Sequence, residues 1–400
     1  ICTSQVPDFL YFYDLLEEGK KALDSGFKKF VNCKIDSKKL SILLFTSGTT
    51  SKSKAVMLNQ YGIATNVNDM LLVESFYSND VNIAFLPYHH IFGSTGMLVM
   101  LSSGVKTVFP DGLKYIQKNL VEYKVSVFVG VPVLIDKMHS TIMKEVQKQG
   151  KTKLINTMIK ISNILMKLHI DVRRKLFKPL IKALGGNMRF IISGGAPLDK
   201  KVAKWFNDIG IHLVQGYGLT ETSPVIGIGT NKYHKVGSIG KTVPSVEAKV
   251  VDCNKEGIGE LIVKGPNIML GYYQNEEATK KAIVDGWFYT GDLARIDEEG
   301  YIFICGRKKN VIVLKNGKNI YPEEMENLIN KIEGVEESFI YGKQLSSDKE
   351  NIKIYAKIVY DEEVVKNAYK VQSKEEIHKE IANKIAARNG LNTMSAQAVG

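Results

Sequence analysis

Apolar runs alternate with helical patterns through the first half of the chain. The runs are rich in Val, Ile, Leu and Phe, which is typical of strands covered on both faces. We expect buried strands over residues 41–46, 81–86, 125–131, 188–192 and 211–214. Helical patterns lie between such runs, for example over residues 114–123 and 200–209. Strands that alternate with helices predict an α/β fold, with a layered domain around a largely parallel sheet.

The pattern changes after about Lys235. Short strand patterns separated by Gly, Asn and Asp indicate a β-subdomain with antiparallel pairing, and they occupy residues 247–252, 259–264 and 301–305. A charged segment that mixes helix and strand patterns follows. Its helices are expected over residues 322–332 and 374–385, with an alternating strand over 352–360.

One stretch combines apolar periodicity with positive charge. Apolar residues at steps of three and four run from Leu154 to Leu184, which predicts an amphipathic helix, unbroken or broken near Asp171. Residues 136–182 hold twelve Lys and Arg against three acids, a local balance of +9. A solvated surface helix explains this pattern, and so does a contact with a membrane surface.

Composition narrows the classes of protein. Hydrophobic residues make up 44% and charged residues 24% of the 400 residues, which excludes a disordered or collagen-like chain. The length suggests two or three folding units. A net charge of +12 points to an anionic partner, such as a nucleotide, a nucleic acid or a membrane surface. The four cysteines are scattered, which favours a reducing compartment, and we expect a cytoplasmic protein that is either free or peripheral at a membrane.

The strongest local signal is FTSGTTSKSKAV, residues 45–56. Small hydroxyl residues surround a glycine and a lysine follows, in the order Thr46, Ser47, Gly48, Thr49, Thr50 and Lys54. Backbone N–H and hydroxyl groups of such a loop can converge on a phosphate. The loop is not a Walker motif, because GxxxxGK[ST] is absent. A polar surface turn is the alternative for this loop taken alone.

Five further motifs follow in order. They are LPYHHIFG (86–93), SGGAPL (193–198), QGYGLTETSP (215–224), YTGDL (289–293) and GRKKNVIVLKNGKNIYPEEME (306–326). Together with the loop they resemble the adenylate-forming superfamily, which includes acyl-CoA synthetases, firefly-type luciferases and peptide-synthetase adenylation domains. The resemblance covers about residues 10–385. The basic insertion over 137–184 and NIYPEEMEN are most similar to long-chain fatty acyl-CoA synthetases.

The resemblance implies a site for ATP and AMP. Thr46 and Lys54 would act in catalysis with Glu221, and Glu221 and Thr46 would hold Mg²⁺, which prefers hard oxygen ligands. Tyr217 would stack on adenine, and Asp292 and Arg307 would bind the ribose and a phosphate. The other implied nucleotide contacts are Ser47, Gly48, Thr49, Thr50, Gly195, Ala196, Gln215, Gly216, Gly218 and Thr220. Taken singly, a loop Glu is normally solvated and a loop Tyr is normally half-buried packing.

The resemblance also implies an acyl and coenzyme A side. His90 would lie near the acyl carboxylate, although His89 leaves the assignment open by one residue and a structural histidine is an alternative. Lys309 falls on the family's hinge position, and Gly317 resembles the glycine that approaches the pantetheine channel. The implied domains are a large one over 1–305, with its β-subdomain at about 236–305, and a small mobile α+β one over 306–400.

The sequence departs from the family pattern at several positions. Ser51, Ser53 and Ala55 replace Gly, Pro and Gly of the phosphate loop, and Asn310 replaces the Asp of the hinge region. The family's C-terminal catalytic lysine has no convincing match, since Lys384 lies in a charged helical pattern. Family members also carry a longer segment before the loop. We therefore expect a chain truncated at both ends, with impaired activity.

The implied reaction has two steps. A fatty acid carboxylate attacks the α-phosphate of Mg-ATP to give acyl-AMP, and the thiol of coenzyme A then displaces AMP. We expect a long-chain fatty acid–CoA ligase that uses ATP, Mg²⁺ and coenzyme A. Alternatives are an adenylating enzyme with another acyl substrate or a carrier-protein acceptor, and a non-catalytic nucleotide- or membrane-binding module. Nucleic acid is not expected as a partner, because the basic helix lacks interleaved aromatic residues for base stacking.

Overall fold

The computed structural model describes residues 3–46, 53–230, 234–314, 319–345, 348–387 and 394–398, with 344, 345, 348–351 and 394–398 described by their backbone alone. The chain separates into a unit of residues 1–39 and a unit of residues 40–400. The first unit contains helix α1 (Phe12–Asp24), which buries none of its side chains. The second unit contains all six motifs singled out in the sequence.

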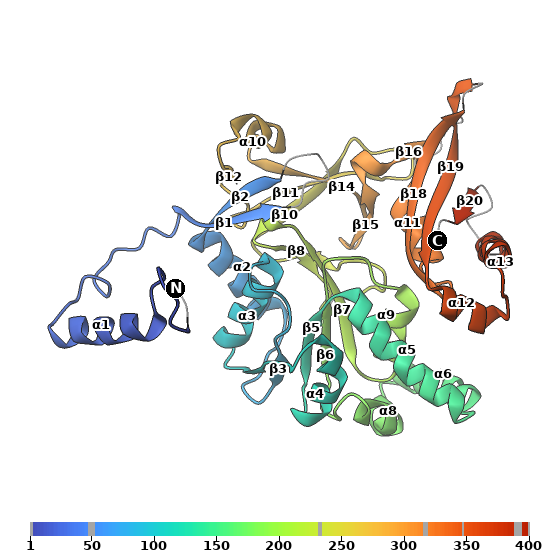
Figure 1. The fold of residues 1–400 in the computed structure, drawn as a ribbon, viewed down its shortest axis with the longest axis horizontal. Coiled ribbons are helices and arrows are strands. Elements are labelled where there is room, and N and C mark those ends of the chain that lie inside the picture. The colour runs from blue at the N-terminus through green and yellow to red at the C-terminus, as the bar shows by residue number, and fades with distance from the viewer. Residues whose placement is uncertain are drawn as a thin grey trace. The chain divides into compact units, whose positions relative to one another are not determined.

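The second unit is built around a seven-stranded sheet with the order β4-β3-β5-β6-β7-β8-β9 (Figure 1). Strands β4 to β7 pair in parallel, and β8 and β9 continue the sheet in antiparallel fashion. The strands are β3 (Val81–Ile83), β4 (Lys106–Val108), β5 (Val127–Gly130), β6 (Phe190–Ser193), β7 (His212–Gly218), β8 (Val225–Ile228) and β9 (Lys241–Thr242). The predicted parallel sheet is confirmed.

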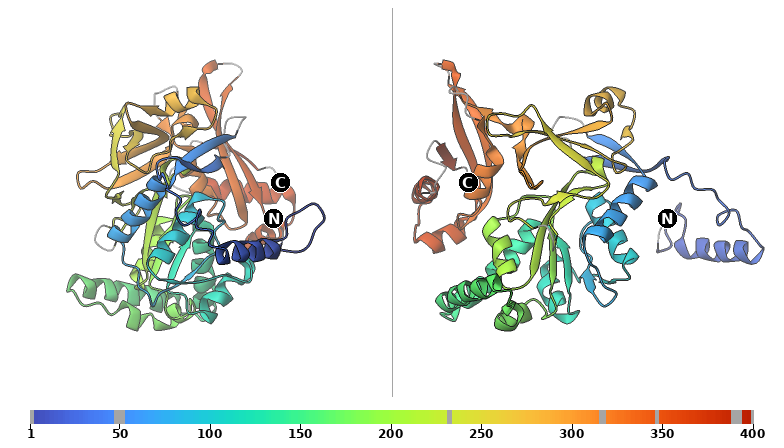
Figure 2. Two further views of the ribbon diagram at one scale, coloured as in Figure 1. Left: turned by 90° about the vertical axis from the view of Figure 1, so that its left-hand side faces the viewer. Right: turned by 180° about the vertical axis from the view of Figure 1, so that it is seen from behind.

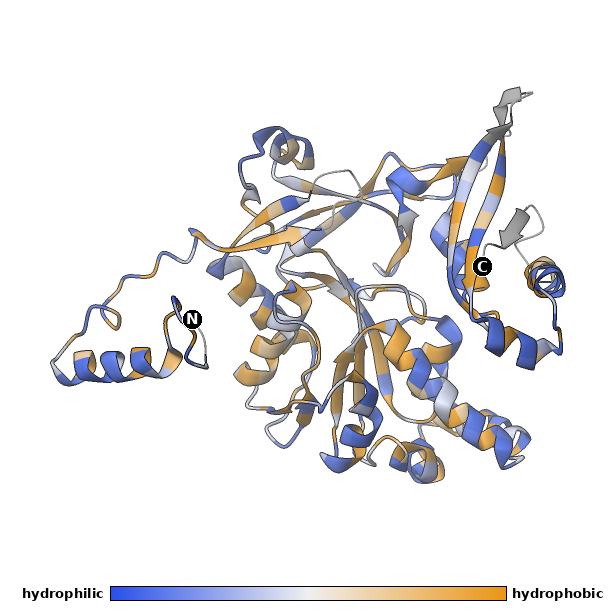
Figure 3. Cartoon of the chain, in the orientation of Figure 1, coloured by the Kyte–Doolittle hydropathy of each residue, from blue (hydrophilic) through white to orange (hydrophobic). Residues whose placement is uncertain are grey.

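Helices cover both faces of this sheet (Figures 1 and 2). One face carries α2 (Gln60–Val73) and α3 (Ile91–Ser102), and the other carries α5 (Pro132–Lys148), α6 (Thr152–Lys167) and α9 (Lys200–Asp208). Alternate residues of β6 point to opposite layers, so Phe190 and Ile192 join the apolar cluster of the first face and Ile191 that of the second. Burial on both faces explains why these strands are continuous apolar runs, visible as orange arrows in Figure 3.

The strand expected over 41–46 belongs to a different sheet. Strand β1 (Leu40–Thr46) pairs with β2 (Lys54–Asn59), and β2 pairs with β12 (Gly271–Tyr272), all antiparallel. Strand β1 is at the edge of this sheet, and Phe45 is 72% exposed. The prediction of a buried strand is therefore wrong, because an apolar run does not reveal whether another layer covers it.

The helix expected over 154–184 is interrupted. Three helices replace it: α6, α7 (Arg173–Leu176) and α8 (Lys178–Lys182). Helix α6 ends at Lys167, and His169 has a positive φ of 60°. The break thus falls close to Asp171. This confirms the alternative of a broken helix over that of an unbroken one.

The phase of α6 also differs from the prediction. Ile155 and Ser162 are its buried residues, whereas Leu154, Ile161 and Leu168 of the predicted apolar stripe are exposed. Leu and Ile lie on both sides of this helix, so periodicity alone could not show which side faces the core. The helix is amphipathic, but its exposed side is apolar too.

The predicted antiparallel β-subdomain is confirmed. A five-stranded antiparallel sheet contains β10 (Glu247–Val251), β11 (Gly259–Lys264), β13 (Ile283–Val284), β14 (Trp287–Ile296) and β15 (Ile302–Arg307). Helix α10 (Glu276–Ala282) connects β12 to β13. Helix α4 (Ile116–Glu122), in the central part of the chain, begins after a short 3₁₀ turn over Leu113–Tyr115.

The C-terminal part has an apolar cluster of its own, which includes Ile329, Ile358 and Ile377. Its strands are β16 (Ile312–Val313), β17 (Asn319–Ile320), β18 (Val335–Leu345), β19 (Asp348–Tyr360) and β20 (Met394–Ala398). Its helices are α11 (Pro322–Ile329), α12 (Glu362–Tyr369) and α13 (Lys374–Ala386), the first beginning at Pro322 as predicted. Among the described residues, no helix is long and apolar enough to span a membrane.

Candidate active site

Several of the expected nucleotide contacts lie at the carboxyl ends of β6 and β7. Gly195 and Ala196 follow β6 in an exposed turn, where Gly195 has a φ of +84°. Gln215, Gly216, Tyr217 and Gly218 form the end of β7, where its pairing changes from parallel with β6 to antiparallel with β8. A crevice at such a change of strand direction is a common ligand site in open α/β sheets.

Gly218 is required by a close approach of the backbone. A Cβ atom at this position would lie 1.9 Å from the carbonyl oxygen of Pro224, which no side chain can tolerate. The tight loop leads directly into a 3₁₀ turn over Thr220–Thr222 that carries Thr220 and Glu221. The backbone carbonyl of Glu221 accepts a 2.8 Å hydrogen bond from the N–H of Met269, which fixes the turn against the β-subdomain.

Glu221 is held by a residue that the sequence did not single out. The hydroxyl of Tyr272 donates a 2.9 Å hydrogen bond to Oε1 of Glu221. Nζ of Lys54 lies 4.5 Å from the centre of the Tyr272 ring. The burial of Tyr272, followed by the charge of Glu221, raises the pKa of its hydroxyl well above the usual range. Tyr272 therefore acts as a donor to the Glu221 carboxylate.

The pairing of β2 with β12 explains how these residues meet. Tyr272 is in register with Val56, two residues beyond Lys54, and the N–H of Tyr273 bonds to the carbonyl of Ala55. Residues more than two hundred positions apart thus lie on adjacent strands. The local sequence around Tyr272, GYY, does not indicate that this tyrosine contacts Glu221 and Lys54. The contact arises only from the strand pairing.

Asp292 forms the second cluster of the site. It is 4% exposed, and its carboxylate accepts hydrogen bonds from the Tyr217 hydroxyl at 2.5 Å and pairs with Nε of Arg307 at 2.9 Å. Burial raises the pKa of Asp292, while the charge of Arg307 opposes this shift. Burial and the charge of Asp292 raise the pKa of Tyr217 far above its usual range. The two carboxylate oxygens that could accept from a ribose are thus engaged by protein donors.

The two clusters lie close enough to interact electrostatically. The charge of Glu221 contributes to the raised pKa of Asp292, as does that of Glu323 at the start of α11. Burial, and then the charge of Arg307, lowers the pKa of Lys309. The charge of Asp292 raises this pKa, and the charge of Lys54 lowers it further. The structure therefore brings Lys54, Glu221, Tyr217, Asp292, Arg307 and Lys309 to one region.

His90 has a structural role in this conformation. It is the N-cap of α3, and its Nδ1 accepts a 3.3 Å hydrogen bond from the N–H of Phe92. Burial, followed by the charge of His89, lowers the pKa of His90, so the neutral ring that can accept this bond is favoured. His89 lies exposed beside it.

Thr46 lies next to Lys54, Lys384 has no match to the catalytic lysine, and several expected contacts lie outside the described residues. The hydroxyl of Thr46 lies at the end of β1 and donates a 3.4 Å hydrogen bond to the carbonyl of Lys54. Lys384 pairs with Glu380 at 3.3 Å on α13. Five expected contacts lie outside the described residues: Ser47, Gly48, Thr49, Thr50 and Gly317.

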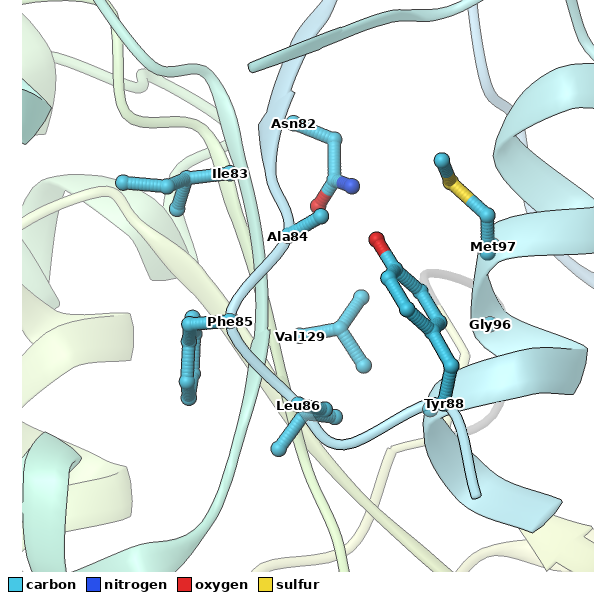
Figure 4. Close-up of a pocket in the computed structure, with 10 residues that line it drawn as sticks. Asn82, Ile83, Ala84, Phe85, Leu86, Tyr88, Gly96, Met97 and Val129 are labelled. Carbon is cyan, nitrogen blue, oxygen red and sulfur yellow. The ribbon is translucent and has the colours of Figure 1, made fainter. Parts of the chain in front are cut away.

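A small apolar hollow lies between β3, β5 and α3, next to the segment that carries His90 (Figure 4). Phe85, Leu86, Tyr88, Met97 and Val129 line it, and Gly93 and Gly96 form its helical side. A Cβ atom on Gly96 would have only Val129 within 4 Å, at 4.0 Å, so this side of the hollow is open.

The donor set of Glu221 fits magnesium chemistry. One carboxylate oxygen is anchored by Tyr272, and Oε2 has no hydrogen-bond partner among the described residues. Mg²⁺ is commonly bound by one or two carboxylates together with phosphate oxygens and water. Within the described residues, no group of three or more His, Cys, Asp or Glu residues is placed to hold a metal ion without other ligands.

Comparison with known proteins gives several matches. A family model described as AMP-binding enzyme matches residues 4–273. The chain is 32% identical over 300 residues to long-chain-fatty-acid–CoA ligase FadD15 of Mycobacterium bovis, covering 71% of this chain and 49% of that protein. It is 30% identical over 368 residues to the long-chain-fatty-acid–CoA ligase of Salmonella typhimurium, covering 88% and 57% respectively. The chain spans about half the length of these curated relatives.

Solved structures share the fold. ATP-bound MatB from Rhodopseudomonas palustris aligns with a TM-score of 0.67 at 26% identity, covering 92% of this chain and 65% of that one. The predicted α/β architecture is thus confirmed by comparison as well as by topology. Because the family model covers more than half of its residues, this chain belongs to the AMP-binding enzyme family.

Proposed function

We propose that this protein is an AMP-forming long-chain fatty acid–CoA ligase. The observation that carries the proposal is that two clusters lie in one region: Lys54, Tyr272 and Glu221, and Tyr217, Asp292 and Arg307. The first offers a cation and a carboxylate for phosphates, and the second an acceptor and a planar donor for a nucleoside. The names of the relatives at 30–32% identity support the fatty acid as substrate.

The nucleotide would lie across the ends of β6 and β7. Gly195, Ala196, Gln215, Gly216, Gly218 and Thr220 would line the adenine side, with Tyr217 beneath the base. Asp292 would accept hydrogen bonds from the ribose hydroxyls, with Arg307 beside it. The loop of Ser47, Gly48, Thr49 and Thr50 would receive the phosphates together with Thr46 and Lys54.

The first step is an in-line displacement at the α-phosphorus. A carboxylate oxygen of the fatty acid bonds to phosphorus as the bond to pyrophosphate breaks. Lys54 and Arg307 would offset the charge that gathers on the phosphate oxygens. Glu221 would hold Mg²⁺ with Thr46, and the bound ion would neutralise phosphate charge. His90 would lie near the incoming carboxylate.

In the second step, the thiol of coenzyme A attacks the acyl carbon. The sulfur–carbon bond forms, AMP leaves with the electrons of the acyl–phosphate bond, and the thiol proton passes to solvent. Gly317 would lie near the pantetheine arm. Lys309 would be the hinge between a large domain over 1–305 and a small domain over 306–400, an arrangement supported by the separate apolar cluster of the C-terminal part.

The hollow beside α3, with a volume of about 20 Å³ in this conformation, is the proposed entrance for the acyl chain and would have to widen to admit it. Its lining is apolar, and it adjoins the segment that carries His90.

Coenzyme A and a fatty acid would be the partners, in the cytoplasm or at a membrane surface reached through residues 152–184. Free thiols at Cys33, Cys253 and Cys305 suit a reducing compartment.

A second candidate is an adenylating enzyme with another acyl substrate or a carrier-protein acceptor. The likeness to ATP-bound MatB at 26% identity supports the nucleotide site, which both candidates share. Product analysis with labelled fatty acid, with coenzyme A present or omitted, separates the two acceptors. A purely nucleotide-binding role would leave no acyl product in either assay.

The test of the proposed function is a series of thermal melts with acyl-sulfamoyl-adenosines of increasing acyl length. These mimics of acyl-AMP need the pocket but no chemistry. A ligand at 100 times its dissociation constant stabilises by about 2.7 kcal/mol. A shift that grows with acyl length supports a long-chain enzyme, and a shift independent of length favours the second candidate. A cooperative melt with no shift overturns both.

A further inference from the structure

Helix α6, with its C-cap residue Leu168, carries an apolar face that the described residues of the unit 40–400 leave more than half uncovered. Leu154, Ile161, Ile164 and Leu168 are 55%, 51%, 60% and 64% exposed. Leu154, Ile161 and Leu168 are seven residues apart, so they project from the same side at every second turn. The buried residues Ile155 and Ser162 directly follow Leu154 and Ile161, about 100° further around the helix, and face the body of the unit. The face is about 21 Å long at 1.5 Å per residue.

A row of lysines borders this face. Lys153, Lys160 and Lys167 are also seven residues apart, each directly before one of the exposed apolar residues. All three are exposed, and none has an ion pair or hydrogen bond with the described part of the chain. The next acid along the chain after the helix, Asp171, is engaged by Arg173 through a 2.8 Å ion pair. Asp208, whose carboxylate accepts a 3.2 Å hydrogen bond from Asn163 of α6, pairs with Lys204 instead.

We propose that this face of α6 binds an anionic lipid bilayer, with the apolar side chains at the level of the headgroups and the lysines on phosphates. Interfacial helices combine an apolar face with flanking basic residues in this way. The charge of the lysine row favours an anionic partner, and the exposed apolar surface continues past the helix. Ile170 is half exposed and lies in the loop after α6. A helix packed along α6 could not extend its contact to this loop in a regular way. A lipid surface fits such an irregular extension better than a partner helix does.

The inference deepens the proposed function and rests on it for the source of the substrate. A long-chain fatty acid partitions into lipid, so a ligase held at the bilayer would receive its substrate by lateral transfer. Binding to vesicles needs neither nucleotide nor acyl group, so it is measured separately from the melts. If the chain binds vesicles but no acyl-adenylate mimic, the proposal for the membrane face stands and the ligase proposal is overturned.

The test is co-sedimentation of the 400-residue chain with phosphatidylcholine vesicles containing 0 or about 30% phosphatidylglycerol. The triple variant Lys153→Gln/Lys160→Gln/Lys167→Gln should lower the partition coefficient about 125-fold, at roughly fivefold per lysine near an anionic surface. The control Lys255→Gln/Lys280→Gln/Lys281→Gln removes the same net charge from exposed lysines elsewhere. It should leave binding within about twofold, and binding of the parent chain should fall as salt shortens the Debye length below about 10 Å.

The apolar contribution has its own pair of variants. Ile161→Ser/Leu168→Ser should reduce binding at least tenfold, whereas Leu101→Ser/Leu113→Ser, at exposed leucines outside α6, should not. Cooperative melts confirm that each variant folds. No binding to anionic vesicles, or equal losses in test and control variants, overturns the proposal. A dimer that Ile161→Ser disperses, without vesicle binding, would assign the face to a second copy instead.

Discussion

The hydroxyl of Tyr272 donates a 2.9 Å hydrogen bond to Glu221, while its ring lies 4.5 Å from Nζ of Lys54. One side chain thus touches both the anionic and the cationic group expected to meet the phosphates. The hydroxyl makes one contact and the face of the ring makes the other, so a substitution can remove the first contact and keep the second.

Tyr272→Phe tests the hydrogen bond alone. The ring and its contact with Lys54 remain, but the Glu221 carboxylate loses its anchor. A hydrogen bond to a charged group contributes about 1.5–3 kcal/mol, so the affinity for Mg-ATP should fall at least tenfold. Isothermal titration at several Mg²⁺ concentrations measures this. Tyr273→Phe, at the exposed neighbouring tyrosine, is the control and should bind as the parent does.

Asp292→Asn should separate binding from stability. Burial raises the pKa of Asp292, so the charged form is unfavourable in the folded state, and the amide should be neutral or slightly stabilising at pH 7. The amide pairs poorly with Arg307 and accepts less well from a ribose, so ATP affinity should fall about tenfold or more. Urea unfolding and ATP titration are the two measurements. Parallel loss of stability and affinity would contradict this, and Glu298→Gln serves as an exposed control.

Gly96→Leu should shorten the acyl chain that the site accepts. The new side chain would enter the open side of the hollow, where Val129 is the only neighbour within 4 Å. Leucine also favours a helix over glycine by up to about 1 kcal/mol, so the fold should not suffer. Melts with short and long acyl-sulfamoyl-adenosines measure the effect. The matched variant Gly19→Leu, on α1 with no atom within 4 Å, should leave the length profile unchanged.

Asp136 on α5 should make stability depend on pH. Burial and then Asp199 raise its pKa from 3.8 to about 6, while Lys331 opposes them. Because the folded state holds this proton more tightly, stability falls as pH rises from about 4 to about 6. Asp136→Asn should therefore gain about 1–2 kcal/mol at pH 8 and little at pH 4. Urea unfolding at both pH values checks this, with Glu145→Gln as the exposed control on the same helix. An equal gain at both pH values would rule out titration of Asp136 as the cause.

The parallel core was predictable because its residues follow one rule. Phe190, Ile191 and Ile192 are all apolar since each faces a covered side of β6. The antiparallel sheet was predictable from its turn residues. Phe45 and Leu154 show the limit of the same rule: both are apolar, yet both are exposed. Hydrophobicity reports what a residue could bury, and only the packing of other segments decides whether it does.

The residues of the candidate site could be predicted only where they belong to contiguous sequence motifs. Glu221, Tyr217, Asp292 and Arg307 stand in such motifs, and the structure brings them to one region. Tyr272 was missed because its partner is 51 residues away and is reached only through β12. The cap formed by His90 was missed for a related reason, since its bond to Phe92 depends on where α3 begins.

Arg307 ties the proposed ribose ligand to the residues just before the proposed hinge. A nucleotide whose ribose bonds to Asp292 and whose phosphate bonds to Arg307 would contact both partners of this ion pair, because a carboxylate has lone pairs for more than one donor. Linkage makes the coupling reciprocal: a turn of the C-terminal part that withdraws Arg307 lowers nucleotide affinity by the same factor by which a bound nucleotide favours the orientation that keeps Arg307 in place. Nucleotide occupancy and the orientation of the C-terminal part are therefore two coordinates of a single thermodynamic cycle, coupled through one ion pair.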